Sequence, residues 1–303
     1  MIGLALGRAA LLAACVAAAD GGRPLPPSAL AVSVNGVWRE WWRSERASAR
    51  YADGALALAP LVQWRAGADG TSWSELELSG TGEAWRTRLV IVRIDPRVVR
   101  LALDTAFADG SAAWTLDRAR PDAVVAVNAG QFVQTLPWGW VMLDGVQYLR
   151  PSVAPLVSTL TVAASGRVQL THGRIPDSTG VRWAFQSYPT LLDAGVVPAP
   201  LRAADCGVDV AHRDARLALG LDGEGRLLIA LTRFDAMGSV LGRVPFGLTT
   251  PEMAAVMGAL GASDAVLLDG GISAQLLVRD GHGVSHRWPG VRKVPLALIA
   301  RPR

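Results

Sequence analysis

Asp269 follows a short apolar segment and is followed directly by two glycines. Residues 265–268 have the length and composition of a buried strand, so Asp269 lies where that strand ends. A carboxylate at this position can be directed into a cleft. Gly270 and Gly271 permit close approach of the backbone and can present N–H groups to an anion. The alternative is a tight turn in which Asp269 bonds its own backbone.

Three other polar residues could act with Asp269, and each has a structural alternative. Glu252 could be a second carboxylate, but Thr249 and Glu252 also have the spacing of a helix capping box. Arg216 could hold a phosphate through paired hydrogen bonds, or it could pair with a carboxylate. Asn128, after the predicted strand 124–127, could bond sugar hydroxyls or only stabilise a turn. Both interpretations of each residue remain open.

Other familiar catalytic patterns are missing from the sequence. There is no nucleophile elbow, phosphate-binding glycine loop, zinc-protease helix or CxxC pair. His282 and His286 are four residues apart, but the glycines around them favour a loop with solvated histidines over a helix that presents both. The sequence therefore predicts no cofactor and no metal.

The composition excludes several classes of protein. The 303 residues are 50% hydrophobic and 18% charged, which is typical of a folded chain and not of a disordered one. No interior apolar run reaches the roughly 18 residues that span a bilayer. The net charge is +4, and Lys293 is the only lysine among the 30 basic residues. Because no arginine run or basic aromatic stripe is present, we expect no nucleic-acid partner. The 11 Trp could stack on sugars, although most tryptophans belong to protein cores.

The first residues have the pattern of an export signal. Residues 1–19 are short and apolar, and a polar, proline-rich segment follows them. Residues 12–15 (LAAC) resemble a bacterial lipobox, in which Cys15 would carry a lipid anchor to the membrane. Cleavage after residues 17–19 is the alternative. We expect export to the periplasm or cell envelope, and the oligomeric state is left open.

Apolar patterning predicts mostly strands. Residues 37–50 and 251–260 have helical spacing, and in the second segment Thr250 could be the cap and Gly261 the end. No regular alternation of strands and helices is present. The predicted fold class is α+β, with a strand-rich mixed or antiparallel sheet core and a few flanking helices. The predicted strands are 72–78, 86–94 with 98–103 as a hairpin-like pair, 124–127, 158–163 with 167–171, 217–221 with 227–231, 265–268 and 294–299.

The segment 247–275 resembles the phosphodiester glycosidase family. The matching elements are the helix start at 249–252 (TTPE) and the strand end at 268–273 (LDGGIS). Further elements follow the family's order between about residues 91 and 300. They are 126–132 (AVNAGQF), Gly139, Asp144 with Gly145, 186–192 (QSYPTLL) and 216–220 (RLALG). Three residues depart from the family pattern, and they could reshape a sugar pocket: Ala129, Gln131 and Ile272.

The resemblance implies a domain division and a set of site residues. Residues 1–19 would be the signal, 20–90 an N-terminal extension with a Trp-rich segment, and 91–303 the family domain. Catalytic residues would be Asp269 and Glu252. Substrate-binding residues would be Arg216, Asn128, Gly130, Gly270, Gly271, Ser273, Gln186 and Tyr188.

The resemblance also implies an activity. We expect hydrolysis of a sugar-1-phosphodiester at the anomeric carbon, which passes through an oxocarbenium-like transition state normally served by two carboxylates. Two alternatives remain. One is a glycan-binding envelope lipoprotein without activity, and the other is a metal-dependent phosphoesterase that splits the P–O bond.

Overall fold

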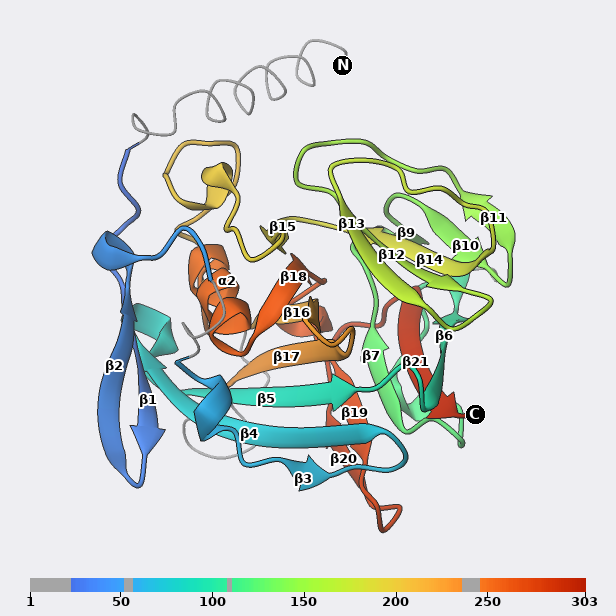
Figure 1. Ribbon diagram of the computed structural model, residues 1–303, viewed down its shortest axis with the longest axis horizontal. Helices are drawn as coiled ribbons and strands as arrows, with labels where there is room; N and C mark the ends of the chain where they lie inside the picture. Colours follow the sequence, from blue (N-terminus) through green and yellow to red (C-terminus); the bar gives the residue numbers. More distant parts are fainter. Residues whose placement is uncertain (1–22, 52–56, 108–110, 236–245) are drawn as a thin grey trace.

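Antiparallel sheet makes up most of the regular secondary structure of the described chain, which comprises residues 23–51, 57–107, 111–235 and 246–303 of a computed structural model (Figure 1). Within these residues α2 (Thr250–Ala259) is the one α-helix. The prediction of a strand-rich antiparallel core is confirmed. The expectation of a few flanking helices in an α+β fold is wrong for the described residues, because they are mostly β.

The largest sheet has nine strands, and one of them, β18, ends just before Asp269. Its order is β15-β18-β16-β17-β5-β4-β1-β2, with β3 paired to β4, so strands from both sides of residue 90 share it. The strands are β1 (Ala29–Val34), β2 (Val37–Arg43), β3 (Arg65–Ala66), β4 (Thr71–Gly80), β5 (Thr87–Ile94), β15 (Thr190–Leu192), β16 (Leu217–Asp222), β17 (Leu227–Phe234) and β18 (Ala262–Leu267).

Two five-stranded sheets and a two-stranded ribbon complete the fold. The first has the order β11-β10-β14-β12-β13 and the second β20-β19-β7-β21-β6, while β8 pairs with β9. Their strands are β6 (Val99–Thr105), β7 (Val125–Asn128), β8 (Phe132–Val133), β9 (Leu136–Pro137), β10 (Val141–Leu143), β11 (Val146–Leu149), β12 (Ser158–Ala163), β13 (Val168–His172), β14 (Val181–Ser187), β19 (Leu276–Arg279), β20 (Ser285–Trp288) and β21 (Leu296–Pro302).

The central strands of the nine-stranded sheet are buried on both faces. Along β5, Val90 and Val92 belong to the core shared with the five-stranded sheets, whereas Leu89 and Ile91 belong to the core that contains α2. Successive side chains of a strand point to opposite faces, so one strand contributes to both cores. This explains why the strands near the site are almost continuously apolar.

Two predicted hairpins are confirmed. β16 pairs with β17 across the turn at Asp222, and β12 pairs with β13. Asp222 accepts hydrogen bonds from the N–H groups of Glu224 and Arg226 (both 2.9 Å) and forms an ion pair with Arg226. Asp222 is therefore a turn-stabilising residue, as the sequence indicated.

The helix predicted over residues 37–50 is wrong. Residues 37–43 form β2, and β1 pairs with it across Asn35 and Gly36. Both turn residues have positive φ (52° and 77°), which is the geometry that an Asn-Gly hairpin turn requires. The spacing of the tryptophans resembles a helix, but the turn chemistry and strand pairing decide the local structure.

The predicted pairing of strands 86–94 and 98–103 is also wrong. Both strands exist, as β5 and β6, but β5 pairs with β4 and β17 while β6 pairs with β21. Since both edges of β5 are occupied, the turn at Asp95 carries the chain into a different sheet.

The helix predicted over 251–260 is confirmed as α2. Its N-cap is Thr249 rather than Thr250, and the Thr249 hydroxyl accepts from the N–H of Glu252. The Glu252 carboxylate in turn accepts from the N–H of Thr249 at 2.8 Å, which completes a capping box. Glu252 is 0% exposed and forms a two-point ion pair with Arg213, with both N–O distances 2.8 Å. Gly261 follows the helix with a positive φ of 97°.

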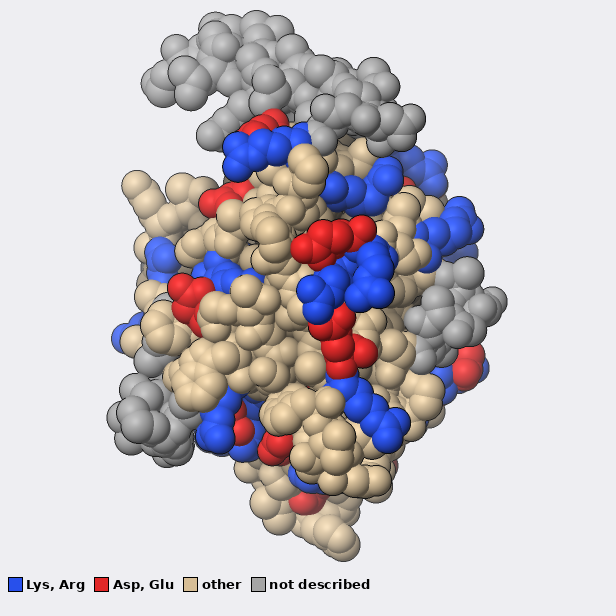
Figure 2. All heavy atoms as spheres, turned by 90° about the vertical axis from the view of Figure 1, so that its left-hand side faces the viewer, with Lys and Arg blue, Asp and Glu red and all other residues tan. Residues whose placement is uncertain are grey.

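The surface charge is mixed on the side formed by β1 and β2. Figure 2 shows arginine and acidic side chains interleaved there, without a continuous basic patch. Arg43 and Arg46 both pair with Glu40 on this side. None of the described helices is long and apolar enough to cross a membrane. The predicted export signal and Cys15 lie outside the described residues.

We predict that Gly258→Ala destabilises the protein although alanine is the better helix former. A Cβ at position 258 would lie 2.3 Å from Cγ of the largely buried Tyr51, so the ring must move. Overpacking of this kind costs about 1–3 kcal/mol. Chemical denaturation checks the prediction, with Gly258→Ala repeated in a Tyr51→Ala background as control. The substitution should be neutral or stabilising there, and an equal loss in both backgrounds would contradict the packing argument.

We predict that Glu252→Gln destabilises the fold by about 3–5 kcal/mol, because the largely buried Arg213 loses its two-point carboxylate partner and keeps only the longer pair with the exposed Glu83 at 3.8 Å. Denaturation measures the loss. Glu77→Gln, a matched change at an exposed strand position, should alter stability by less than about 0.5 kcal/mol. A Glu252→Gln protein of unchanged stability would refute the structural role.

Candidate active site

Asp269 lies just beyond the end of β18, where β7 and the turn after β18 meet. Its N–H donates to the carbonyl of Gly130 at 3.2 Å, and its own carbonyl accepts from the Asn128 side chain at 2.8 Å. The other end of the Asn128 amide accepts from the N–H of Gln275 at 2.9 Å. Asn128, which is 1% exposed, thus positions the Asp269 loop and has both ends of its amide occupied by protein.

The glycines around Asp269 are required by close backbone contacts. A Cβ on Gly270 would lie 2.4 Å from the carbonyl oxygen of Ala215, and one on Gly130 (φ 68°) would lie 2.8 Å from that of Gln186. The N–H of Gly271 donates to Ala215 at 2.6 Å, so this group is not available to an anion in the way the sequence suggested. The glycines bring the Asp269 loop against the segment before β16.

This contact brings a second carboxylate to the site, that of Asp214. A Cβ on Gly271 would lie 2.8 Å from Oδ2 of Asp214, so Asp214 lies against the Gly270–Gly271 turn that directly follows Asp269. The ring of His212 is close to the same carboxylate, with Nε2 and Oδ2 3.9 Å apart. Asp214 is not among the site residues predicted from the sequence. A signal was present, since Asp214 and Arg216 are two residues apart in an extended segment and so share a face.

Both carboxyl groups resist ionisation. Burial raises the pKa of Asp214 above its ordinary value, although the charge of Arg216, the N–H of Ala215 and the nearby His212 oppose the effect. Burial likewise raises the pKa of Asp269. A hydrogen bond from the Ser273 side chain and the charge of Arg292 lower it, and the negative charge of Asp214 raises it further.

One oxygen of Asp269 is left without a protein partner. Oδ2 is buried and has no hydrogen bond to any described residue. A buried polar atom without a partner is costly and uncommon, and such atoms are often found at functional sites. Together with the raised pKa, this atom identifies Asp269 as the strongest candidate for chemistry in the described part of the chain.

An open cleft of about 670 Å³ adjoins the Asp214 side of the turn. Its lining includes Asp214, His212, Arg213, Gly271 and Ile272. Ile272, which departs from the family pattern, is 45% exposed and forms part of the cleft wall. A ligand in this cleft would therefore contact Asp214 directly.

Arg216 and Gln186, both predicted to bind substrate, are occupied by protein contacts. Arg216 donates through Nε to the carbonyl of Leu248 at 2.8 Å and through Nη2 to that of His212 at 2.5 Å. Burial lowers the pKa of Arg216. The negative charge of Asp214 is the largest of the effects that oppose this lowering. Gln186 is 1% exposed and bonds Trp140, Ser152 and Thr159. Both residues shape the site without facing the cleft.

The exposed Arg292, which the sequence patterns did not single out, places a positive charge near Asp269. Arg292 is exposed, its guanidinium carbon lies 4.6 Å from the centre of the Phe132 ring, and its charge acts on Asp269. The N–H of Arg292 donates to the carbonyl of Ile272 at 3.0 Å, which fixes the backbone beside the turn. The local sequence around Arg292 carries no signal for this role, because the contact joins distant segments.

A pair of accessible aromatic rings lies next to the same loop. The rings of Trp138 and Tyr188 are 5.2 Å apart at an interplanar angle of 58°, and Tyr188 is 48% exposed. Gln131, the residue after Gly130, donates to the carbonyl of Tyr188 at 3.2 Å. Tyr188 was predicted as a ligand-binding residue, whereas Trp138 was not singled out. Such rings present the flat apolar surface on which sugars stack.

Of the remaining predicted residues, Ser273 contacts Asp269 and Glu252 does not. Ser273 is 2% exposed and hydrogen-bonds Asp269, so the structure brings these two together. Glu252 is instead held in the capping box and the Arg213 pair, with no exposed surface. No residue near Asp269 belongs to a metal-type cluster in the described ranges. The one such group there consists of His172, Asp193 and Asp264.

Comparisons with known proteins show a family match and a likeness of fold. The family model described as phosphodiester glycosidase matches residues 121–301. The zebrafish N-acetylglucosamine-1-phosphodiester alpha-N-acetylglucosaminidase catalytic domain is similar in fold, with TM-score 0.56 and 15% identity over 85% of this chain and 96% of that one. A putative exported protein of Burkholderia pseudomallei is also similar, with TM-score 0.51 and 16% identity over 75% and 77% of the two chains.

No curated protein sequence matches the chain. The structural likenesses, at these identities, concern the fold alone. The family match covers more than half of the residues and includes Asn128, Asp214 and Asp269. The chain belongs to the phosphodiester glycosidase family.

Proposed function

We propose that the protein hydrolyses a sugar-1-phosphodiester at the anomeric carbon and releases a free sugar and a phosphomonoester. The observation that carries the proposal is the pair of carboxyl groups, Asp214 and Asp269, both with raised pKa values, beside one glycine turn: Asp269 directly precedes it and Asp214 lies against Gly271. Cleavage at an anomeric carbon passes through an oxocarbenium-like transition state, which two carboxyl groups normally serve.

The two carboxyl groups have different surroundings and so are suited to different roles. Asp214 faces the cleft beside Arg216 and His212, whose charges favour its ionised form. As a carboxylate it would stabilise the positive anomeric carbon and attack it directly or through a water. Burial raises the pKa of Asp269 and the charge of Asp214 adds to this effect, so Asp269 would retain its proton above the ordinary range of a carboxyl group and donate it to the leaving phosphate oxygen.

The leaving group would be held by Arg292. A phosphomonoester departs with the electron pair of the broken C–O bond, so a nearby cation stabilises the developing charge. Arg292 is exposed and close enough to lower the pKa of Asp269, whereas two nitrogens of Arg216 already bond carbonyl groups. We therefore assign the phosphate contact to Arg292 in place of Arg216.

The sugar would stack on Trp138 and Tyr188. This pair supports a carbohydrate ligand but also fits the alternative of a glycan-binding protein without activity. Release of free sugar from a phosphodiester distinguishes the two. Sugar phosphate as the product, lost on chelation, would instead indicate the metal-dependent phosphoesterase. The proposed export to the cell envelope, with or without a lipid on Cys15, rests on residues 1–19 alone and is independent of the reaction.

We predict that Asp269→Asn and Asp214→Asn each lower kcat/KM on a sugar-1-phosphodiester by about 10³-fold. Loss of a carboxyl group that acts only in the transition state corresponds to roughly 4 kcal/mol. Asp222→Asn is the matched control, because Asp222 stabilises a hairpin turn. It should remain within a few-fold of the wild type. Equal losses in all three variants would contradict the assignment.

Melting temperatures separate loss of chemistry from loss of fold. The raised pKa of Asp269 means that its ionised form is disfavoured in the folded state. The protonated group therefore favours the folded state at low pH, and this stabilisation is lost as pH rises through the pKa of the folded protein. Asp269→Asn should therefore melt at or above the wild-type temperature at pH 7, with a smaller difference at pH 4. An inactive variant that melts well below the wild type would instead make Asp269 structural.

We predict a bell-shaped dependence of kcat/KM on pH, displaced to higher pH than ordinary carboxyl pKa values would give. Activity should fall as pH drops through the raised pKa of Asp214, which must be ionised. It should also fall as pH rises through the raised pKa of Asp269, which must be protonated. Residual activity of Asp214→Asn should lack the acid limb. A profile that is unchanged in both variants would refute these roles.

A further inference from the structure

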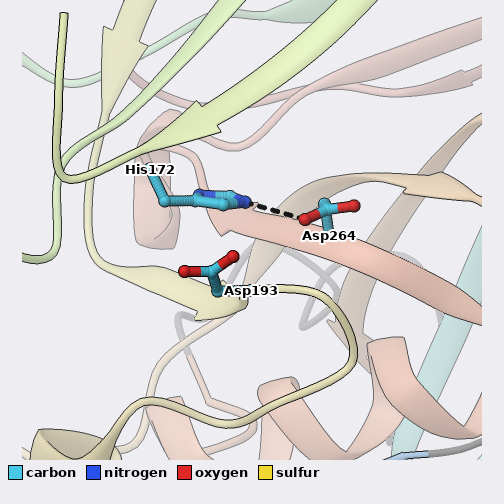
Figure 3. A group of neighbouring side chains, drawn as sticks. All are labelled: His172, Asp193 and Asp264. Carbon is cyan, nitrogen blue, oxygen red and sulfur yellow. Dashed lines mark hydrogen bonds and ion pairs between the residues drawn. The ribbon is translucent and has the colours of Figure 1, made fainter.

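A histidine and two aspartates from separate segments converge away from the Asp269 site. His172 ends β13, Asp193 directly follows β15, and Asp264 lies within β18. One side-chain ligand atom from each lies within 4.8 Å of the other two. Figure 3 shows the Asp193 carboxylate directed toward the His172 ring and the Asp264 carboxylate beyond it. Two of these strands belong to the nine-stranded sheet and the third to a five-stranded sheet.

The imidazole of His172 is held in one orientation. Its side chain is 6% exposed, and its Nδ1 lies 2.7 Å from the hydroxyl of Ser158, which in turn lies 2.8 Å from that of Thr190. The contact at Nδ1 directs Nε2 toward Asp264. Metal-binding histidines usually have such an outer partner on the second ring nitrogen, and it fixes both the tautomer and the ring.

Ser158, His172 and Asp264 do not form a nucleophilic triad. Ser158 is 1% exposed, so its hydroxyl cannot reach a substrate. Its hydroxyl also shares a hydrogen bond with Thr190. The accessible end of the group is at Asp193 and Asp264, which are carboxylates rather than nucleophilic hydroxyls.

The two aspartates are suited to different parts of a coordination shell. Asp264 is held by the protein: its Oδ1 lies 3.1 Å from Nε2 of His172 and accepts from the N–H of Ala194 at 3.1 Å, and its Oδ2 accepts from the Ser263 hydroxyl at 2.8 Å. These contacts fix the carboxylate beside the His172 ring. Asp193 has an exposed side chain on a turn, with its N–H donating to Val196 at 2.9 Å, so the carboxylate can move on a fixed backbone.

We propose that His172, Asp193 and Asp264 bind a divalent transition-metal ion, with Zn²⁺ the best fit. Nε2 of His172 and Oδ1 of Asp264 are 3.1 Å apart. Ligands about 2.0–2.1 Å from a tetrahedral zinc ion are separated by roughly 3.3 Å, so this pair already has nearly the required spacing. Asp193 and water would complete the shell. A nitrogen ligand disfavours Ca²⁺ and Mg²⁺, which prefer oxygen.

The bound ion would join two sheets and take no part in the hydrolysis. The ion would link β13 to β18 and to the residue that follows β15. Without the ion, the contact between His172 and Asp264 joins β13 to β18 here. Asp269 lies five positions after Asp264, which at about 3.3 Å per residue separates their backbones by up to roughly 16 Å along the strand and its end. The proposal is thus independent of the proposed reaction, and its readout is metal binding itself.

Zinc binding to the full chain without a histidine tag, stripped with chelator, tests the proposal. Calorimetry should give one Zn²⁺ per chain with a Kd of about 1 µM or lower, and saturating Zn²⁺ should raise the melting temperature by several degrees. Co²⁺ should give visible absorption from a nitrogen- and oxygen-bound ion. Turnover of the stripped and loaded protein should agree within a few-fold.

Substitutions locate the ion. Asp193→Asn leaves the pair of His172 and Asp264 intact, so the fold should survive while zinc affinity falls by at least about 10-fold; His172→Gln should abolish binding. His286→Asn is the matched control, since His286 and Asp280 also form a His–Asp pair at 3.0 Å. It should bind zinc as the wild type does. Absence of stoichiometric binding, or equal binding by Asp193→Asn and the wild type, would overturn the proposal.

Discussion

Burial of both faces of the nine-stranded sheet is the constraint on which the site depends. Alternate residues of β5, β16 and β17 are distributed between two separate cores, so none of these strands can shift by one residue without exchanging its two faces. The register of β16 against β18 is fixed in this way, and with it the positions at which the two strands begin and end. Asp214 lies just before β16 and Asp269 just after β18, so the sheet places both carboxyl groups.

Close backbone contact then sets the distance between the two acidic segments. Gly270 lies against Ala215, and Gly271 lies against Asp214, at separations that leave no room for a Cβ. Partial burial of both carboxyl groups around this contact is the main cause of their raised pKa values. The same geometry that assembles a reactive pair therefore destabilises the ionised forms of its members, and the extensive apolar burial elsewhere offsets this.

Several polar residues of the matching motifs support the backbone around the site rather than face the cleft. Asn128 holds the Asp269 loop, Gln186 joins three segments of the neighbouring sheet, and Arg216 holds the carbonyl groups of Leu248 and His212. Their polar atoms are occupied by protein, as burial requires. The groups left accessible to a ligand are Asp214 in the cleft, Arg292 and the pair of Trp138 and Tyr188.

The sequence by itself determined the strand-rich character, the hairpin at Asp222, helix α2 and the family, because these follow from local apolar periodicity, turn residues and ordered motifs. It did not determine that residues 37–43 pair as a strand, since tryptophans three and four apart satisfy a helical pattern equally well. Only the tertiary structure decided that Glu252 is enclosed in a helix cap and that Asp214 stands opposite Asp269. It also brought His172 to Asp193 and Asp264. The physical reason is that burial and contact between strands distant along the chain depend on sheet order, which local patterns do not encode.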